Sequence, residues 1–310
     1  MHSYFDTFIK ALATHGHLVR STNIVSSPIG SESISDPEGH VLATLGEPKD
    51  DLAEVVSRLP HLFIYGGGHV ALQLYRLARQ GGMEVDVFDE RPEWGSKERY
   101  PEATVHQGPL QDMLAPLSAP SAYAVIMTHR YDQECLAYAL RQPFSYIGMI
   151  GSRTKTNIAF RTMKEEGFTD KDLEKVHAPI GLKTGGDTPF EVAVSIMAQI
   201  IQTYTGGEKH HMVCDERILR LAGESKDGVL VRVLENKGSS PATPGAMMLV
   251  EKDRFYGTIG GGMIEKTAID HAREITESEV AEYDMSQRGD LDMVCGGKAR
   301  VLYTVLKNFD

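Results

Sequence analysis

The hydrophobic pattern divides the chain into three regions. Over residues 1–60 it predicts a helix at 3–14, strands at 18–25 and 40–45 with a polar loop between them, and a helix at 51–59. We interpret this stretch as an N-terminal α+β segment.

From residue 61 onward, short β-rich runs alternate with helical stretches. The runs lie at 62–65, 85–88, 104–106, 124–128 and 145–149, the helical stretches include 70–79 and 133–141, and a longer helix is predicted at 189–203. Strands that alternate with helices are typical of a parallel sheet covered on both faces. The sequence therefore predicts a Rossmann-like domain over 61–205.

Residues 206–211 have the composition of a linker, and the pattern then changes again. Strands are predicted at 229–234, 246–250, 255–259 and 300–305, with a helix at 264–275. The expected fold class is thus α/β, with a Rossmann-like parallel-sheet domain and a smaller α+β domain over 212–310.

Three short pieces of the N-terminal segment resemble pieces of the last domain. Residues 18–20, 26–28 and 44–46 run parallel to 230–232, 239–241 and 258–260. If the resemblance is a repeat, the first copy is degenerate, because it lacks the triple glycine that ends the second. The alternative is chance similarity over few positions.

Composition excludes several classes of protein. The 310 residues carry 32 Lys+Arg against 43 Asp+Glu, a net charge of −11, without the basic clusters that nucleic-acid binding needs.

Three scattered cysteines form neither a disulfide framework nor a zinc motif, and we expect the adjacent His210 and His211 to be solvated rather than bound to a metal. No apolar run approaches the ~20 residues of a membrane helix, and Asp6 and Lys10 interrupt any signal-like start. We expect a cytoplasmic protein.

The clearest local motif follows the strand at 62–65. This strand runs into Gly-x-Gly-x-x-Ala, in which Gly66 makes the turn, Gly68 lets a pyrophosphate approach the backbone and Ala71 allows close helix packing. Asp89, which ends the next strand, is placed to accept hydrogen bonds from a ribose and so favours NAD. The alternative is a surface acid that caps the turn before Pro92, and dinucleotide binding stays open.

Polar residues also end the two following strands of the predicted sheet. Thr128 and His129 follow one strand, and Gly151 and Ser152 follow the next, so all four are expected at the carboxyl edge where ligands bind in open α/β sheets. His129 is a candidate for acid–base chemistry or phosphate binding. The alternative is a capping cluster with Asp132.

Glycine-bearing turns recur in the last domain, at 238–241, 260–262 and 295–297. Backbone N–H groups in such turns can form an anion or cofactor pocket. Cys295 is the one thiol flanked by glycines and is a candidate reactive residue, whereas Cys135 and Cys214 are interpreted as structural. Hairpin turns around a buried cysteine are the alternative.

These motifs together resemble the XdhC/CoxI family, the accessory factors of xanthine dehydrogenase and related molybdenum hydroxylases. The resemblance rests on segments 66–70, 87–91, 127–129, 146–153, 179–182, 188–189, 238–241, 245–246, 257–262 and 295–297. The order of the two domains is reversed relative to the usual family order. Ala242 and Met247 stand where the family often has basic residues.

The resemblance implies a cofactor chaperone rather than an enzyme. Such a protein binds the molybdenum cofactor (a pyranopterin), protects it while a cysteine desulfurase adds a sulfido ligand, passes it to a xanthine dehydrogenase-like hydroxylase, and is expected to form homodimers. The predicted cofactor-binding residues are Gly66, Gly67, Gly68, His69, Val70, Asp89, Thr128, His129, Gly151, Ser152, Ser239, Ser240, Gly260, Gly261, Gly262, Cys295 and Gly296. The alternatives are an NAD-dependent oxidoreductase with His129 as proton donor, and a nucleotide-sensing regulatory module.

Overall fold

The computed structural model describes residues 2–114, 121–205, 212–238, 241–285 and 297–309. The chain divides into two compact units. One unit is Leu59–His210, and the other combines Met1–Arg58 with His211–Asp310. The N-terminal segment therefore shares a unit with the C-terminal residues.

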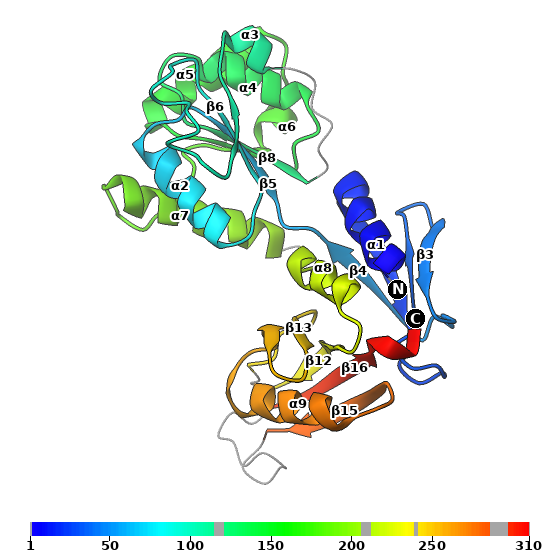
Figure 1. The fold of residues 1–310 in the computed structure, drawn as a ribbon. Coiled ribbons are helices and arrows are strands. Elements are labelled where there is room, and N and C mark those ends of the chain that lie inside the picture. The colour runs from blue at the N-terminus through cyan, green and yellow to red at the C-terminus, as the bar shows by residue number, and fades with distance from the viewer. Residues whose placement is uncertain (1, 115–120, 206–211, 239–240, 286–296, 310) are drawn as a thin grey trace. The chain divides into compact units, whose positions relative to one another are not determined.

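A six-stranded parallel sheet forms the centre of the Leu59–His210 unit, as predicted (Figure 1). Its strand order is β10-β9-β8-β5-β6-β7, so the chain starts in the middle at β5, moves one way to β7 and then returns to the other side of β5. This reversal between β5 and β8 is the position where open α/β sheets bind ligands. The strands are β5 (His61–Tyr65), β6 (Val85–Phe88), β7 (Thr104–His106), β8 (Ala122–Ile126), β9 (Tyr146–Met149) and β10 (Val176–His177).

Both faces of this sheet are covered by helices. On one face, α2 (His69–Gln80) and α7 (Pro189–Thr205) pack against Leu62 and Ile64, and on the other, α4 (Asp132–Arg141) packs against Phe63 and Tyr65. Burial on both faces explains why the strands are almost continuously apolar. The remaining helices of the unit are α3 (Leu110–Met113), α5 (Arg153–Glu165) and α6 (Asp170–Leu173).

The other unit contains two five-stranded sheets that share the order of four strands and differ in the edge strand, which is parallel to its neighbour in the first sheet and antiparallel in the second. The first is β11-β4-β1-β2-β3 and the second, read from the matching edge, is β15-β16-β12-β13-β14. In both, a strand that follows a helix lies at the centre, and the next two strands extend to one side. The strands are β1 (His17–Thr22), β2 (Glu32–Ser35), β3 (Val41–Leu45), β4 (Leu52–Ser57), β11 (Met212–Val213), β12 (Val229–Lys237), β13 (Met247–Val250), β14 (Phe255–Gly257), β15 (Glu279–Asp284) and β16 (Lys298–Val305).

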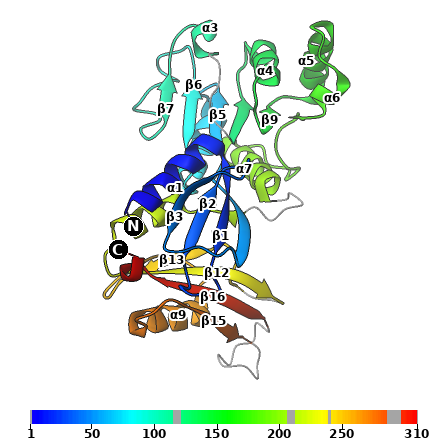
Figure 2. The same ribbon diagram turned by 90° about the vertical axis from the view of Figure 1, so that its right-hand side faces the viewer.

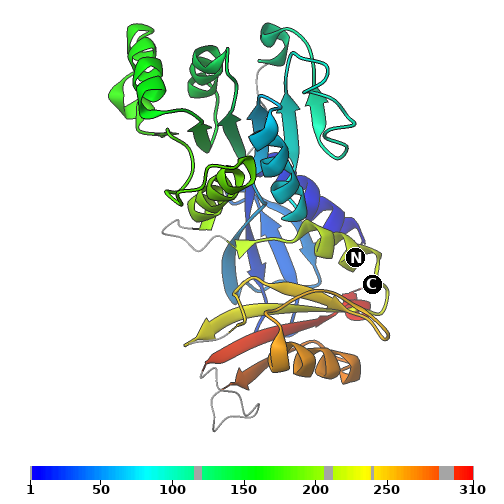
Figure 3. The ribbon, with the colours of Figure 1, turned by 90° about the vertical axis from the view of Figure 1, so that its left-hand side faces the viewer.

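Helices α1 (His2–His15) and α8 (Glu216–Glu224) precede the central strands and share one core with both sheets (Figure 2). Phe5, Phe8 and Leu12 recur at helical spacing on α1 and are almost fully buried. Helix α9 (Gly262–Glu274) covers the opposite face of the second sheet, with Ile264 and Ala268 in its core (Figure 3). A short 3-10 helix, Leu306–Phe309, ends the described chain.

The predicted helix at 51–59 is wrong, because this segment forms strand β4. Glu54 and Val56 alternate with less buried neighbours, which is the period of a strand paired with β1. Asp51, which looks like a helix cap in the sequence, instead accepts hydrogen bonds from the N–H groups of residues 24–26, and these bonds lower its pKa to about 2. The polar loop predicted before β3 also contains β2.

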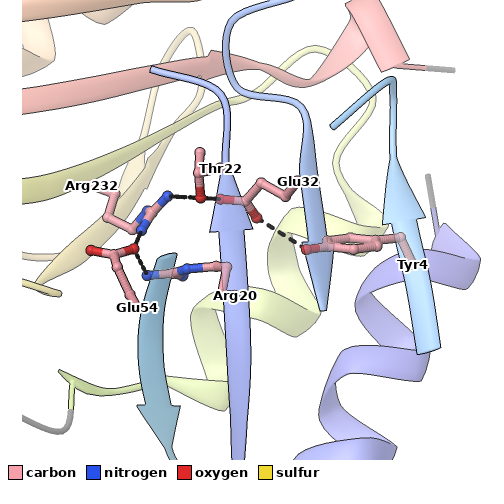
Figure 4. A network of polar contacts seen from close by, with 6 residues as sticks. All are labelled: Tyr4, Arg20, Thr22, Glu32, Glu54 and Arg232. Atoms are coloured by element: carbon pink, nitrogen blue, oxygen red, sulfur yellow. Dashed lines mark hydrogen bonds and ion pairs between the residues drawn. The ribbon is translucent and has the colours of Figure 1, made fainter. Parts of the chain in front are cut away.

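Two buried arginines occupy matching positions on the central strands of the two sheets. Arg20 on β1 and Arg232 on β12 are each 2% exposed, and both bind Oε2 of Glu54 (Figure 4). The Arg20 Nη2 contact is 3.1 Å long. Burial by itself would raise the pKa of Glu54, but the two guanidinium groups outweigh it and hold that pKa below its usual value.

A second carboxylate completes this network. Glu32 accepts 2.8 Å and 3.1 Å hydrogen bonds from Arg232 and Thr22 at Oε1, and a 3.1 Å bond from the Tyr4 hydroxyl at Oε2. Arg232 also donates to Thr22 over 2.8 Å. The two arginines and two glutamates balance in charge, so the network joins the sheets without an uncompensated buried ion.

In the parallel-sheet unit, Asp86 of β6 lies between two histidines. Nε2 of His61 and Nε2 of His106 are each 2.5 Å from a different oxygen of the Asp86 carboxylate. Burial would raise the pKa of Asp86, but the hydrogen bonds to His61 and His106 outweigh it and lower that pKa.

This lowered pKa predicts a loss of stability in acid. The stabilisation is fully present above the unfolded-state pKa of about 3.9 and disappears as the pH falls through the lower folded-state pKa. We expect the unfolding temperature of the Asp86→Asn variant to depend less on pH below about pH 4 than that of the wild type. Asp112→Asn is the control, because Asp112 is exposed, and its unfolding temperature should show the same pH dependence as that of the wild type. Equal acid sensitivity in wild type and Asp86→Asn would contradict the assignment.

Candidate functional site

In the glycine turn after β5, two of the three glycines leave no room for a side chain and the third does. Gly66 has φ +105°, and a Cβ there would lie 2.6 Å from the Met127 carbonyl oxygen. A Cβ on Gly67 would lie 2.5 Å from the Trp94 carbonyl oxygen, whereas nothing lies within 4 Å of one on Gly68. Gly66 and Gly67 are therefore required by packing, and Gly68, just before α2, leaves its backbone approachable.

Asp89 is buried and occupied by groups of its own chain. Its Oδ2 accepts from the N–H of Gly67 and from Nη2 of Arg91, each over 2.7 Å. Its Oδ1 accepts from the N–H and Nε of Arg91, over 3.0 and 2.9 Å. Burial would raise the pKa of Asp89, but these hydrogen bonds lower it. Since a carboxylate has about four acceptor sites, binding a ribose requires Asp89 to release Arg91 or Gly67.

A cavity of about 230 Å³ lies at the carboxyl edge of the sheet, around the ends of β5, β6 and β8. It brings together four of the predicted site residues: Gly66, Asp89, Thr128 and His129. The others on this unit, Gly67, Gly68, His69, Val70, Gly151 and Ser152, are not among its lining residues. Its lining also includes Tyr65, Phe88, Glu90, Arg91, Leu110, Met113, Arg130, Tyr131 and Cys135.

Neighbouring helices fix the polar groups around this cavity. Thr128 donates a 2.7 Å hydrogen bond to Asp132 in the first turn of α4, and Asp132 is paired with Lys155 of α5. Ser152 caps α5 by accepting a 3.2 Å hydrogen bond from the N–H of Lys155. His129 is exposed at the cavity rim. Among the four residues predicted at this edge of the sheet, His129 is thus accessible to a ligand, whereas Ser152 has a structural role as the cap of α5.

Sequence reasoning missed the residues that frame the opening. The Tyr131 hydroxyl donates a 2.8 Å hydrogen bond to Oε2 of Glu90, which connects the loops after β8 and β6. Glu90 follows Asp89 in the sequence, and Tyr131 lies two residues after His129. Their closeness to these predicted site residues could have identified them as further candidates. Leu110 and Met113 come from α3, whose sequence carries no motif.

The other unit has its own glycine turn, between β14 and α9. Gly260 has φ +126°, and a Cβ there would lie 2.2 Å from the Pro241 carbonyl oxygen, whereas nothing lies within 4 Å of one on Gly261. Oε2 of Glu265 accepts from the N–H groups of Ile259 and Gly261, over 3.0 and 3.2 Å. Further N–H groups begin α9 at Gly262, where an anion is favoured.

Two of the three cysteines are buried, and the third lies outside the described residues. Burial raises the pKa of Cys135 and of Cys214 to about 12, so both thiols are protonated at neutral pH and unreactive. Cys295, Gly296, Ser239 and Ser240 lie outside the described residues, as do His210 and His211. Their predicted roles stay predictions.

Neither a metal cluster nor a membrane-spanning helix occurs in the described ranges. These ranges contain no group of three or more His, Cys, Asp or Glu side chains that could hold a metal ion. Among the same residues, no helix has the length and apolar character needed to cross a membrane.

Family comparisons match both the parallel-sheet region and the last region of the chain. The model of the XdhC Rossmann domain matches residues 62–200, and that of the XdhC and CoxI family matches residues 221–284. The chain belongs to the XdhC and CoxI family, with the Rossmann domain first.

Individual relatives match parts of the chain. An uncharacterized protein, YqeB, of Escherichia coli strain K12 is 29% identical over 56% of this chain and 34% of its own. A protein of Bacillus subtilis strain 168, named as a probable subunit of xanthine dehydrogenase, is 32% identical over 46% of this chain and 43% of its own. The chain thus spans less than half the length of these curated relatives. A crystal structure titled as a xanthine dehydrogenase from Bacillus halodurans is 22% identical, covers 66% of each chain and has a TM-score of 0.53, which supports the fold alone.

Proposed function

We propose that this protein is an accessory factor that binds the molybdenum cofactor and assists its sulfuration and insertion into a xanthine dehydrogenase-like hydroxylase. Family membership supports the accessory role. A cysteine desulfurase and the apo-hydroxylase are the expected partners.

The observation that carries the proposal is the open glycine turn at the start of α9. Gly261 has φ +75° and free space where a Cβ would lie, and the turn leads into a helix of 13 residues. A helix N-terminus attracts anions such as the phosphate of a pterin cofactor. Glu265 accepts two N–H groups of this turn, so the phosphate is assigned to the first-turn N–H groups from Gly262 onward.

The residues of this chain would hold the cofactor rather than transform a substrate. The turn at 260–262 would bind the phosphate, and Ser239, Ser240 and Cys295 are the further predicted contacts. The bound cofactor supplies the hydroxylase with its molybdenum redox centre. The thiol of Cys295 is a ligand type that suits a thiophilic metal.

Hydroxylase activation in cells tests this function. We expect Gly261→Glu to reduce activation of a co-expressed apo-hydroxylase by about tenfold, because the side chain fills the open approach to the turn and adds a second negative charge to that of Glu265. Gly39→Glu is the matched control, since Gly39 also has positive φ and nothing within 4 Å of its Cβ position. Equal activation by the two variants at equal protein levels would contradict the proposal.

The alternative function, an NAD-dependent oxidoreductase, has less support. Asp89 already accepts hydrogen bonds from the N–H of Gly67 and from Arg91, so the ribose and pyrophosphate contacts of a dinucleotide would compete with bonds that already exist.

A further inference from the structure

A basic depression lies beside the C-terminal half of α2. Its lining comes from residues 75–80 of that helix and from residues 98–102, which lead into β7, and it shares no residue with the cavity beside Asp89. Strand β7 begins at Thr104, so this loop reaches the amino edge of the parallel sheet, opposite the carboxyl edge where ligands of such sheets bind. The volume of about 460 Å³ is room for roughly fifteen water molecules, more than a single carboxylate or phosphate group fills.

Three arginines line this depression, and the chain neutralises only one of them. Arg79 is fixed by a 2.8 Å hydrogen bond to the Met83 carbonyl oxygen and a 3.2 Å hydrogen bond to Glu102. Arg76 is exposed and Arg99 is half-buried, and neither has a carboxylate partner among the residues that the structure describes. Two positive charges are therefore available to a ligand.

The acidic side chains of the depression are engaged elsewhere. Glu102 is paired with Arg79, and the other lining acid, Glu98, accepts hydrogen bonds within its own turn. Bonds from its own N–H and from the Ser96 hydroxyl lower the pKa of Glu98. A carboxylate that binds the other two arginines therefore breaks neither of these contacts.

Arg99 is also held in place before a ligand arrives. Its guanidinium lies 4.8 Å from the centroid of the Trp94 ring, and its Nε and Nη2 are buried without a hydrogen-bond partner among the described residues. A partly desolvated guanidinium without a counter-ion favours an anion at its accessible edge. Because stacking already restricts the side chain, less entropy is lost when Arg99 binds.

From these features we infer that the depression docks a short acidic segment of a partner protein, with its carboxylates on Arg76 and Arg99. Guanidinium groups bind carboxylates through two parallel hydrogen bonds, and arginine and tryptophan are among the residues that contribute most to binding at protein interfaces. In a chain with a net charge of −11, only such a local cluster attracts an acidic partner. A nucleic acid is disfavoured, since its phosphates need a continuous basic surface and Glu98 and Glu102 interrupt this one.

Trp94, the one tryptophan in the chain, provides a native reporter for the experiment. Its ring contacts the Arg99 guanidinium, so a ligand that moves Arg99 changes Trp94 fluorescence. A tetraglutamate peptide capped at both ends, the matching tetraglutamine peptide, inorganic phosphate and an oligodeoxythymidine would be titrated against the full chain at low salt, with calorimetry as a second readout.

We expect tetraglutamate to bind at least about tenfold more tightly than tetraglutamine, and its affinity to fall as salt is added. Arg76→Gln and Arg99→Gln should each weaken tetraglutamate by about tenfold. Arg76 is exposed, so its substitution tests the site without disturbing the fold. Arg161→Gln, the same charge change on an exposed residue of α5, should leave the affinity unchanged. Arg99→Lys, which keeps the charge but not the planar group, should restore only part of the loss.

Three results would overturn the inference: no binding of tetraglutamate at millimolar concentration, equal affinity for the two peptides, or an affinity for tetraglutamate unchanged by both Arg76→Gln and Arg99→Gln. Tighter binding of phosphate would indicate a site for a single oxyanion, and tighter binding of the oligonucleotide would indicate a nucleic-acid site; either would overturn the assignment to an acidic protein segment. The proposed function is tested separately, since normal hydroxylase activation without peptide binding would contradict this inference alone.

Discussion

Replacing Glu54 by glutamine is expected to lower the free energy of unfolding by about 3–5 kcal/mol. The substitution removes the negative charge that both Arg20 and Arg232 contact, and leaves two guanidinium groups 2% exposed with one remaining carboxylate. An uncompensated buried charge keeps its desolvation cost, which is why breaking a buried pair costs far more than its net contribution.

Denaturant unfolding measures this effect, with Glu235→Gln as the matched control. Glu235 also pairs with an arginine, Arg300, at 3.1 Å, but the two side chains are 42% and 31% exposed. Solvent screens such a pair, so the control should change the free energy of unfolding by about 1 kcal/mol or less. If the two variants lost similar stability, the network would not have the role assigned to it.

Gly66→Ala should destabilise the parallel-sheet unit by about 2–6 kcal/mol. The left-handed φ of +105° costs about 1–3 kcal/mol for alanine, and a Cβ 2.6 Å from the Met127 carbonyl oxygen forces a shift that costs about 1–3 kcal/mol more. The Met127 carbonyl belongs to the backbone directly after β8, so it cannot rotate away as the end of a side chain could.

The neighbouring Gly68→Ala is the control for this prediction. Gly68 has φ −71° and nothing within 4 Å of its Cβ position, so the variant should lose about 1 kcal/mol or less. Urea unfolding followed by circular dichroism compares the two variants. Equal stability of the Gly66 and Gly68 variants would mean that the turn is not constrained as described.

The parallel sheet could be predicted because its signal is local. Residues 62–65 are a continuous apolar run that ends in a glycine turn, and burial on both faces needs no knowledge of distant partners. The segment 51–59 lacked such a signal, because Glu54 is a buried strand residue only through Arg20 and Arg232, which lie 34 and 178 positions away. No local pattern identifies a charged side chain that is neutralised by a distant one.

The candidate site was predictable only in part, for the same reason. Gly66, Asp89, Thr128 and His129 were expected at strand ends on one edge of the sheet, and all four line one cavity; their role in binding a cofactor stays a prediction. The motif did not indicate that Arg91 would fill the acceptor sites of Asp89, because side-chain pairing of this kind depends on the local turn. That the N-terminal segment is a degenerate repeat of the last domain also stays a prediction, although Arg20 and Arg232 lie at matching positions in their sheets.

The most direct test of the account is the pterin content of the full-length protein, purified without oxygen from molybdate-fed cells. Pterin would be measured by fluorescence after oxidation and nicotinamide by absorbance, for wild type, Gly261→Glu and Gly39→Glu. The account predicts nearly stoichiometric pterin in wild type and Gly39→Glu and a large loss in Gly261→Glu. Bound NAD without pterin in the wild type would contradict it and favour a nucleotide-dependent function.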